Sequence, residues 1–484
     1  MGAAAGLGVA LAIAWPVARA QSFIPGWMRD PFGVEQMTSP GPERRWEPNE
    51  PLPAVAVPDS SESLTGNGAL TLPELTEFAL RTNPRTRQAW FAARAAAANV
   101  GFTRGDDLPT ITGNFVASRT HPVSGTTGLI APWIDRFGPS ISFSYVLYDF
   151  GAGDDKLEAA EYRLLAANLA HNRVLQDVIF QVEQAYYQLI GVEALVRINE
   201  QSLKNIETAL DAARRRRESG LATVADVYRT ETQVAQAQLT LTRSRGEFEK
   251  ARGQLATVVG LPINSSLRVQ TLASPPQKSQ VVSSVNDYLE TMKAMRPDLV
   301  AAEAQVRAAR ATASAASKAG RPTIEVSGTD AWNIYHVNGP PARPTNLTPL
   351  IALNVRIPIF SGFRETYTAR AAEALAAQAE AARDQLYRQS QLEVWQAYYD
   401  LQTVTSGISS TEAQVKSAEQ TAEATLARYQ AGFGTILDLI TAQQDETNAR
   451  TQRIQSYLDW YTVLARLNLS LGASNLIGMD SGKK

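Results

Sequence analysis

The sequence predicts a mainly α-helical tandem-repeat protein that carries a small transmembrane β part. Three observations predict this fold class. One sequence unit occurs twice in the 484 residues, each copy contains two short segments of alternating apolar and polar residues, and each copy contains helical segments longer than a globular core needs.

The repeat is visible as residues that return at a constant offset. Residues 184–187 read Gln-Ala-Tyr-Tyr and return at 396–399, which is 212 positions later. The same offset relates Gly220 to Gly432, Asp226 to Asp438, Leu255 to Leu467 and Gly260 to Gly472, and an offset of 213 relates Pro84 to Pro297 and Pro109 to Pro322. Unrelated coiled coils of similar composition would not keep these residues in register, so the two units are copies.

Both copies predict the same order of elements. Repeat 1, residues 71–270, is expected to contain a helix over 72–104, strands over 109–119 and 139–148, and long helices over 153–219 and 222–259. Repeat 2, residues 271–474, is expected to contain a helix over 284–318, strands over 322–332 and 349–359, and long helices over 363–431 and 435–471.

The strand segments alternate over about ten residues, which is the pattern of a strand that crosses a bilayer within a barrel. Ile141, Phe143 and Tyr145, for example, alternate with serines. A soluble sheet on a core predicts the same alternation, but long helices flank each hairpin and we find no further strand candidates. We expect Glu325, Asn354 and Arg356, on the polar side, to line a barrel lumen. The alternative is that these residues are only solvated positions of the barrel and do not select what passes through it.

The long helical segments predict a coiled-coil tube. Residues 153–219 contain no proline, and a helix of that length spans about 100 Å at 1.5 Å per residue. Such a length exceeds a globular core and implies packing between helices. Alanine-rich runs, as at 374–382, allow the shallow, close contacts that a wide tube requires.

Composition excludes several function classes. Lys and Arg total 46 against 48 Asp and Glu, so the net charge of −2 gives no basic field for nucleic acid. The absence of cysteine excludes disulfides, thiolate catalysis and Cys-ligated zinc. The sequence shows no phosphate-binding loop, no nucleophile–base motif and no metal-ligand spacing, so we expect no enzyme activity, no cofactor and no metal.

The first residues predict export. Residues 1–20 read as a signal peptide, with an apolar run over 2–17 followed by Ala18-Arg19-Ala20. Residues 21–70 are expected to form a Pro-rich extended tether, and 475–484 an unstructured tail. No later stretch approaches the length of a transmembrane helix, so a membrane-embedded mature chain would have to use its strands.

Four strands cannot close on themselves, and open strand edges in hydrocarbon leave backbone groups unpaired. The chain therefore requires at least one further copy of itself. Eight strands from a dimer and twelve from a trimer both satisfy this argument.

Several features of the sequence together resemble those of the TolC family. They are the two tandem units with prolines before the strands, the exits Tyr148-Asp149-Phe150-Gly151 and Phe360-Ser361-Gly362 into long helices, and the turn from Arg428 to Asp438. The resemblance covers residues 70–474. It implies a homotrimer with one twelve-stranded barrel, four strands per chain, in the lipid of the outer membrane, continued by a long α-helical coiled-coil barrel in the periplasm. It also implies a periplasmic adapter and an inner-membrane pump, either proton-driven or of the ABC type, and no catalytic site.

The resemblance also indicates site residues at the helix turns. Gly220 and Gly432 end helices at the tip, and Asp438 matches a family position where aspartates ring the periplasmic aperture. Thr441 occupies the position one turn later, where some relatives have a second aspartate, and Tyr429 with Asp226 matches a hydrogen-bonded pair that latches the tip. The alternative for both aspartates is a favourable interaction with the helix dipole.

The function that follows is a passive exit duct of a tripartite efflux or export system, with small molecules as the expected cargo. An exit duct for type I protein secretion is the alternative within the family. A soluble periplasmic coiled-coil scaffold is the alternative outside it.

Overall fold

The computed structural model describes residues 69–121, 133–265, 267–270, 284–337 and 345–473, all within one unit of residues 63–484. The expected signal peptide, the tether except for its last two residues, and the tail lie outside the described residues.

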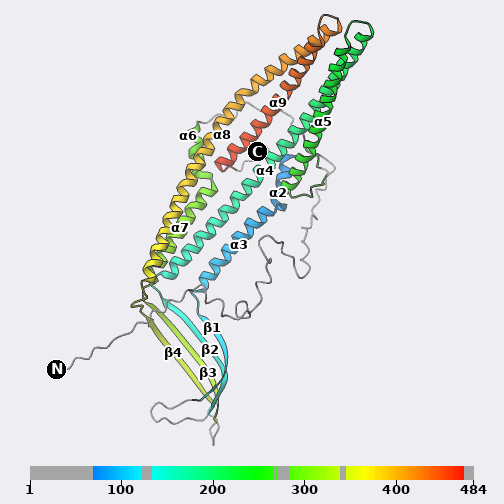
Figure 1. Ribbon diagram of the computed structural model, residues 1–484. Helices are drawn as coiled ribbons and strands as arrows, with labels where there is room; N and C mark the ends of the chain where they lie inside the picture. Colours follow the sequence, from blue (N-terminus) through cyan, green and yellow to red (C-terminus); the bar gives the residue numbers. More distant parts are fainter. Residues whose placement is uncertain (1–68, 122–132, 266, 271–283, 338–344, 474–484) are drawn as a thin grey trace, which may run out of the picture. The chain divides into compact units, whose positions relative to one another are not determined.

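Figure 1 shows a sheet at one end of a set of long helices. The elements of repeat 1 are α2 (Leu72–Thr82), α3 (Pro84–Gly105), β1 (Thr110–Thr120), β2 (Ile134–Tyr148), α4 (Ala152–Glu218) and α5 (Val224–Val259). Those of repeat 2 are α6 (Val285–Met295), α7 (Pro297–Lys318), β3 (Thr323–Val337), β4 (Thr345–Arg356), α8 (Arg364–Gln430) and α9 (Ile436–Leu471).

Corresponding helices of the two repeats have identical lengths. The structure gives 67 residues to both α4 and α8, 36 to α5 and α9, 22 to α3 and α7, and 11 to α2 and α6. The mainly helical repeat fold that the sequence predicts is therefore confirmed, and each residue of these helices in one repeat has a defined counterpart in the other.

The first helix of each repeat is broken, which corrects the expected continuous helices over 72–104 and 284–318. Asn83 and Arg296 adopt extended backbone conformations, with ψ of 127° and 111°, between the two halves. Each precedes a proline, Pro84 or Pro297, whose ring disfavours the helical conformation of the residue before it. Proline then opens the second half, where its missing N–H is not needed.

The four strands form one antiparallel sheet in the order β1-β2-β3-β4. The pairing register of the two strands is the same in both repeats. Thr110 pairs with Ser144 in repeat 1, and their counterparts Thr323 and Arg356 pair in repeat 2. The first strands are related by 213 positions and the second strands by 212, so the length change lies in the hairpin between them.

The strand bounds differ from those expected: β2 begins at Ile134 rather than at 139, β3 ends at Val337 rather than at 332, and β4 begins at Thr345 rather than at 349. The added part of β2 includes Gly138, and Pro139 is the residue at which the expected strand began. Both pair with β1, but the ladder between β2 and β3 skips them. Proline has no N–H to donate to a second strand, and a Cβ on Gly138 would lie 1.7 Å from the Trp332 carbonyl oxygen. At the other hairpin, β4 ends at Arg356 rather than at 359, just before Ile357-Pro358.

Each repeat has its own apolar core, built from counterpart residues. Leu189 and Leu255 are buried in repeat 1, and their counterparts Leu401 and Leu467 are buried in repeat 2. A third cluster joins the far ends of the long helices of both repeats. Among the helices in the described ranges, none is both long enough and apolar enough to cross a membrane.

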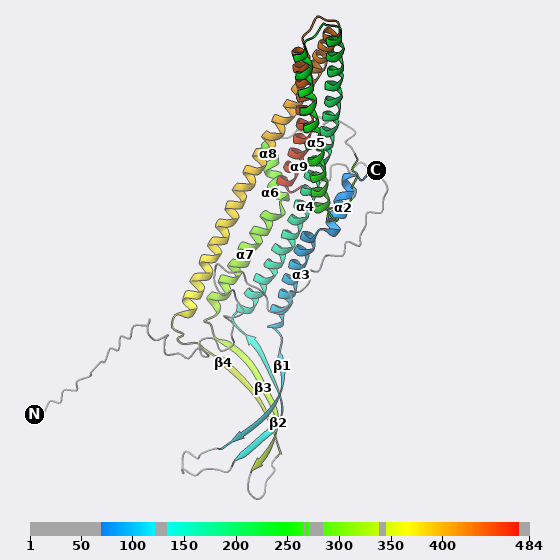
Figure 2. The ribbon, with the colours of Figure 1, turned by 45° about the vertical axis from the view of Figure 1, so that its right-hand side comes forward.

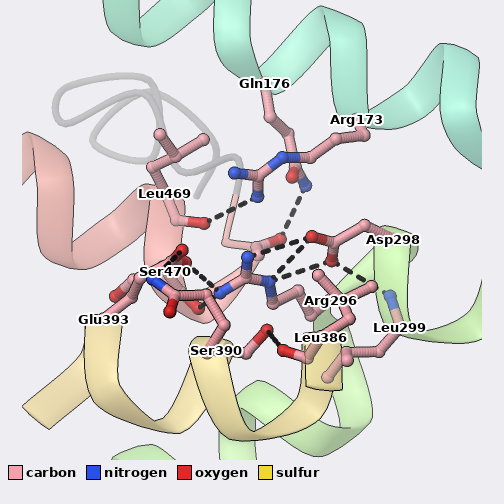
Figure 3. Close-up of polar contacts among 12 residues, drawn as sticks. Arg173, Gln176, Arg296, Asp298, Leu299, Leu386, Ser390, Glu393, Leu469 and Ser470 are labelled. Carbon is pink, nitrogen blue, oxygen red and sulfur yellow. Dashed lines mark hydrogen bonds and ion pairs between the residues drawn. The ribbon is translucent and has the colours of Figure 1, made fainter. Parts of the chain in front are cut away.

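The helix break in each repeat is tied to the end of that repeat's last helix. The Asn83 side-chain amide donates to the Val258 carbonyl at 2.9 Å, and the Arg296 guanidinium donates to the counterpart carbonyl of Ser470 at 3.4 Å. Arg296 is 2 % exposed and forms ion pairs with Asp298 at 2.9 Å and Glu393 at 2.7 Å (Figure 3). The connection between helix break and last helix is therefore made by a neutral amide in repeat 1 and by a buried cation with two carboxylates in repeat 2.

Candidate functional site: the two-faced sheet and the helix tips

The sheet has one polar and one apolar face. The register places Thr112 opposite Ser142, and Ser142 opposite Thr329, on one face. On the other face the register aligns Tyr145, Val326 and Leu353. The apolar face has large side chains that are more than half exposed, namely Ile111, Phe115, Ile141, Ile351, Leu353 and Val355. Asp330 is an exception on that face.

The three residues expected in a lumen lie on the polar face. Glu325 pairs with Asn354, and Arg356 is two positions further along the same strand, so their side chains share one side of the sheet. The Asn354 amide donates to the Ser327 hydroxyl at 2.8 Å. The sheet therefore separates a polar, charged surface from an exposed apolar one, which is the arrangement of a strand wall between water and lipid.

The far ends of the helices form two equivalent turns, α4–α5 and α8–α9, which lie side by side in both views (Figures 1 and 2). Gly220 and Gly432 have φ of 72° and 91°, in the left-handed region that glycine tolerates. In each turn the next residue's N–H bonds back to an arginine carbonyl, Leu221 to Arg216 at 2.8 Å and Phe433 to Arg428 at 2.9 Å. Such bonds satisfy carbonyls at a helix C-terminus, so the two tips end in the same motif.

Both candidate aspartates cap the helix that follows their turn. The Asp226 carboxylate accepts from the Thr223 N–H and hydroxyl at 2.9 and 2.8 Å, and Asp438 accepts from Thr435 at 3.3 and 2.8 Å. The bonds from Thr435 hold the pKa of Asp438 below its ordinary value. Capping of a helix N-terminus therefore accounts for both positions. Asp438 and Thr441 are exposed, whereas Asp226 is half-buried.

The expected bond between Tyr429 and Asp226 is not formed in this structure. The Tyr429 side chain is buried, and among the described residues its hydroxyl has no hydrogen-bond partner. The Asp226 carboxylate instead bonds to Thr223. The Arg216 guanidinium lies 4.6 Å from the centre of the Tyr429 ring and donates to the Tyr429 carbonyl, so Arg216 ties the first tip to the second.

Arg216 belongs to a run of four arginines at residues 214–217, at the end of α4, and nothing in the sequence singles it out for this contact. The contact itself depends on the approach of two helix ends that are more than 200 residues apart in the chain.

Comparison with known proteins identifies the family. The family model described as "Outer membrane efflux protein" matches residues 75–261 and 288–473, one match in each repeat. Protein CyaE of Bordetella pertussis is 27 % identical over 391 residues, covering 80 % of this chain and 80 % of that protein. The outer membrane efflux protein BepC of Brucella suis is 24 % identical over 414 residues, covering 84 % and 87 %.

Solved structures show the same fold. The outer-membrane channel OprN superposes with a TM-score of 0.75 at 22 % identity, covering 83 % of this chain and 90 % of that chain. The outer membrane protein VceC of Vibrio cholerae gives 0.73 at 21 % identity, covering 83 % and 96 %. The resemblance to TolC-type channels that the sequence indicates is thus confirmed, together with the outer-membrane location and the non-enzymatic role as an exit duct. The chain belongs to the outer membrane efflux protein family.

Proposed function

We propose that the chain works as a homotrimer, with a periplasmic adapter and an inner-membrane pump as partners, and that its cargo is small molecules. The two-faced sheet is the observation that carries the proposal. Its exposed apolar face suits lipid, its polar face suits a water-filled lumen, and β1 and β4 are its outermost strands. Three copies would join these edges into one barrel of twelve strands, with Glu325, Asn354 and Arg356 facing the lumen.

The cargo proposal is supported by the relatives, since BepC is described as an efflux protein. It is tested in cells from which the gene is deleted. Such cells should accumulate small amphiphilic dyes several-fold and regain normal efflux when the wild-type gene is returned. Their set of secreted proteins should stay unchanged. Normal dye efflux together with loss of a secreted protein would instead favour type I secretion.

We further propose that three Asp438 carboxylates ring the periplasmic aperture, with Thr441 one turn further in. Because the pKa of Asp438 is lowered, the ring would stay ionised at neutral pH and attract cations. Asp438→Asn should reduce cation preference, read as a smaller reversal potential in a salt gradient across a planar bilayer. The matched control is Asp226→Asn, at the equivalent but half-buried position, with a smaller effect. Equal reversal potentials in wild type and Asp438→Asn would refute the ring.

The pH dependence of the same measurement has a defined sign. A carboxyl whose folded pKa lies below its ordinary value of 3.8 stays charged above that pH. In the ring, repulsion among the three carboxylates opposes this lowering, so cation preference should persist at neutral pH and decline on acidification. A cation preference that does not change between pH 7 and pH 3 would indicate that another group sets selectivity.

A further inference from the structure

The apolar face of the sheet ends in a charged row, at the hairpin that joins β1 and β2. Arg119 lies four positions after Phe115 on β1, so its side chain shares the face of Phe115. The register pairs Arg119 with Asp135, and the Arg119 Nε lies 3.3 Å from an Asp135 carboxylate oxygen. This ion pair therefore stands on the side of the sheet that suits lipid, opposite to the side of the lumen.

The charged row lies at one limit of the apolar face. On β3 this face runs from Ile324 to Ile334, and the row of Ile334 is the last before that of Arg119. These ten positions, at about 3.3 Å each on a strand tilted by about 40°, give a height of about 25 Å. Although Asp330 interrupts it, a face of this height matches the apolar band of a strand wall in a bilayer. Arg119 thus reaches the level of the lipid headgroups, where a charge on this face is tolerated.

The hairpin end of the sheet lies away from the helices in both views (Figures 1 and 2). In an outer-membrane channel of this family the helices stand on the periplasmic side, so the row of Arg119 belongs to the outer leaflet. Membrane lipids commonly carry a phosphate in their headgroups. The charged row is therefore at the depth where a cation on this face can meet a phosphate.

Arg119 is held in a stack of flat side chains. Its Cζ atom lies 5.1 Å from the centre of the Trp133 ring, and Trp133 stacks on His121 with ring centres 4.4 Å apart and ring planes 8° apart. Trp133 is 44 % exposed and stands just before β2, at the outer limit of the apolar face. Tryptophan favours this level of a membrane because its ring is apolar and its N–H is polar. The stack limits the rotamers of Arg119 before any ligand binds, which reduces the entropic cost of binding.

The Arg119 guanidinium has donors to spare. The ion pair with Asp135 uses Nε, and the Arg119 side chain is 59 % exposed. Among the described residues, the two terminal amino groups of Arg119 have no acceptor. Coplanar N–H groups of a guanidinium match two oxygens of one phosphate. Asp135 therefore orients the guanidinium while the terminal amino groups stay open to an anion.

The next arginine along β2 provides a contrast. Arg136 follows Asp135 and therefore projects to the polar face. Its Nε donates to the Asn333 side-chain oxygen at 2.7 Å, and Asn333 is 5 % exposed. Arg136 thus lies at the same height of the sheet as Arg119 but is bonded to a buried neighbour on the opposite face.

We propose that Arg119 and Trp133, with His121 stacked on the indole, form a binding site for the phosphate of an outer-leaflet lipid headgroup. Arg119 binds two phosphate oxygens, and the acyl chains run along the apolar face past Phe137 and Phe115, which are 40 % and 70 % exposed. The proposal rests on the proposed function, in which this face meets lipid, and adds the class of lipid that the face selects.

Native mass spectrometry of the full-length protein in detergent tests the site. The protein is mixed with phosphatidic acid or with phosphatidylcholine of the same acyl chains, in which the choline group neutralises the phosphate. Wild type should retain several-fold more phosphatidic acid. Arg119→Gln should lower this retention to that of phosphatidylcholine, and Arg119→Lys should keep only part of it, since an ammonium lacks the planar pair of donors. Arg136→Gln, the matched control on the polar face, should behave as wild type.

A second variant keeps the arginine and removes the ring beneath it. Trp133→Leu should also lower the retention of phosphatidic acid several-fold, while circular dichroism shows unchanged helical content. Undiminished retention in both Arg119→Gln and Trp133→Leu would overturn the site and leave the assignment of the apolar face to lipid intact. Displacement of the lipid by inorganic phosphate at the same concentration would overturn the headgroup as ligand in favour of a free ion. If wild type retains neither lipid, the assignment of the apolar face to lipid fails as well.

Discussion

At the scale of single residues, Arg296 shows how a buried charge can be specified at a helix break. Its guanidinium forms ion pairs with Asp298 and Glu393 and donates to the Ser470 carbonyl (Figure 3). The buried positive charge is therefore paired with two carboxylates and one neutral acceptor. A buried cation is tolerated when it is paired and hydrogen-bonded in this way. The counterpart Asn83 performs the same connection without charge, which shows that the connection, not the charge, is common to both repeats.

Arg296→Met should be strongly destabilising. Removal of one partner of a buried ion pair costs about 3–5 kcal/mol, since two carboxylates are left without their cation. Thermal unfolding of the detergent-solubilised protein, followed by circular dichroism, measures the effect. Arg310→Met, which removes an exposed pair with Glu380, should cost less than about 1 kcal/mol. Similar shifts in Tm for both variants would contradict the account of Arg296.

Glu183 should make stability depend on pH. Burial between α4 and α9 raises the pKa of Glu183 from 4.5 to about 7. An acid whose folded pKa is raised favours the folded state fully below its unfolded pKa, and this contribution is lost as pH rises from 4.5 through 7. A shift of this size corresponds to about 3 kcal/mol. Glu183→Gln should flatten the decline in Tm between pH 5 and 8, and an unchanged pH profile would show that the carboxyl is not the cause.

At the scale of elements, the positive-φ glycines differ in what surrounds them. Gly220, with φ of 72°, has open space where a Cβ would stand, whereas a Cβ on Gly472 would lie 2.7 Å from the Arg296 Cα. Gly220→Ala should therefore cost only backbone strain, about 1–2 kcal/mol. Gly472→Ala adds a clash with the backbone of the helix break and should cost clearly more. Chemical denaturation of both variants compares them, and equal costs would contradict the close packing at Gly472.

Elements were predictable where one physical rule dominates. Alternation predicted the strands, and the absence of proline predicted α4 and α8 to within a few residues. The breaks at Asn83 and Arg296 were missed because the apolar periodicity continues across them, while the residue before proline cannot keep helical geometry. The early start of β2 was missed because the expected strand began at Pro139, although both Gly138 and Pro139 lie inside the sheet. They remain in the sheet because β1 pairs with them where β3 does not.

At the scale of the whole molecule, the repeat determined what could be predicted about the site. It identified Gly220 with Gly432 and Asp226 with Asp438, and the structure gives each pair the same turn or cap. It could not indicate that Tyr429 contacts Arg216 rather than Asp226, since that depends on how two helix ends approach. Among the described residues, α4 contacts helices of both repeats, whereas its counterpart α8 makes its main contacts within repeat 2.

Single-channel recording of the purified wild-type protein in planar lipid bilayers tests most directly whether the chain forms an outer-membrane exit duct. We expect discrete current steps, carried by an assembly of three chains and shifted in reversal potential by Asp438→Asn. Preparations of folded, trimeric protein that insert into the bilayer and give no current steps would contradict the claim that this chain forms an outer-membrane exit duct.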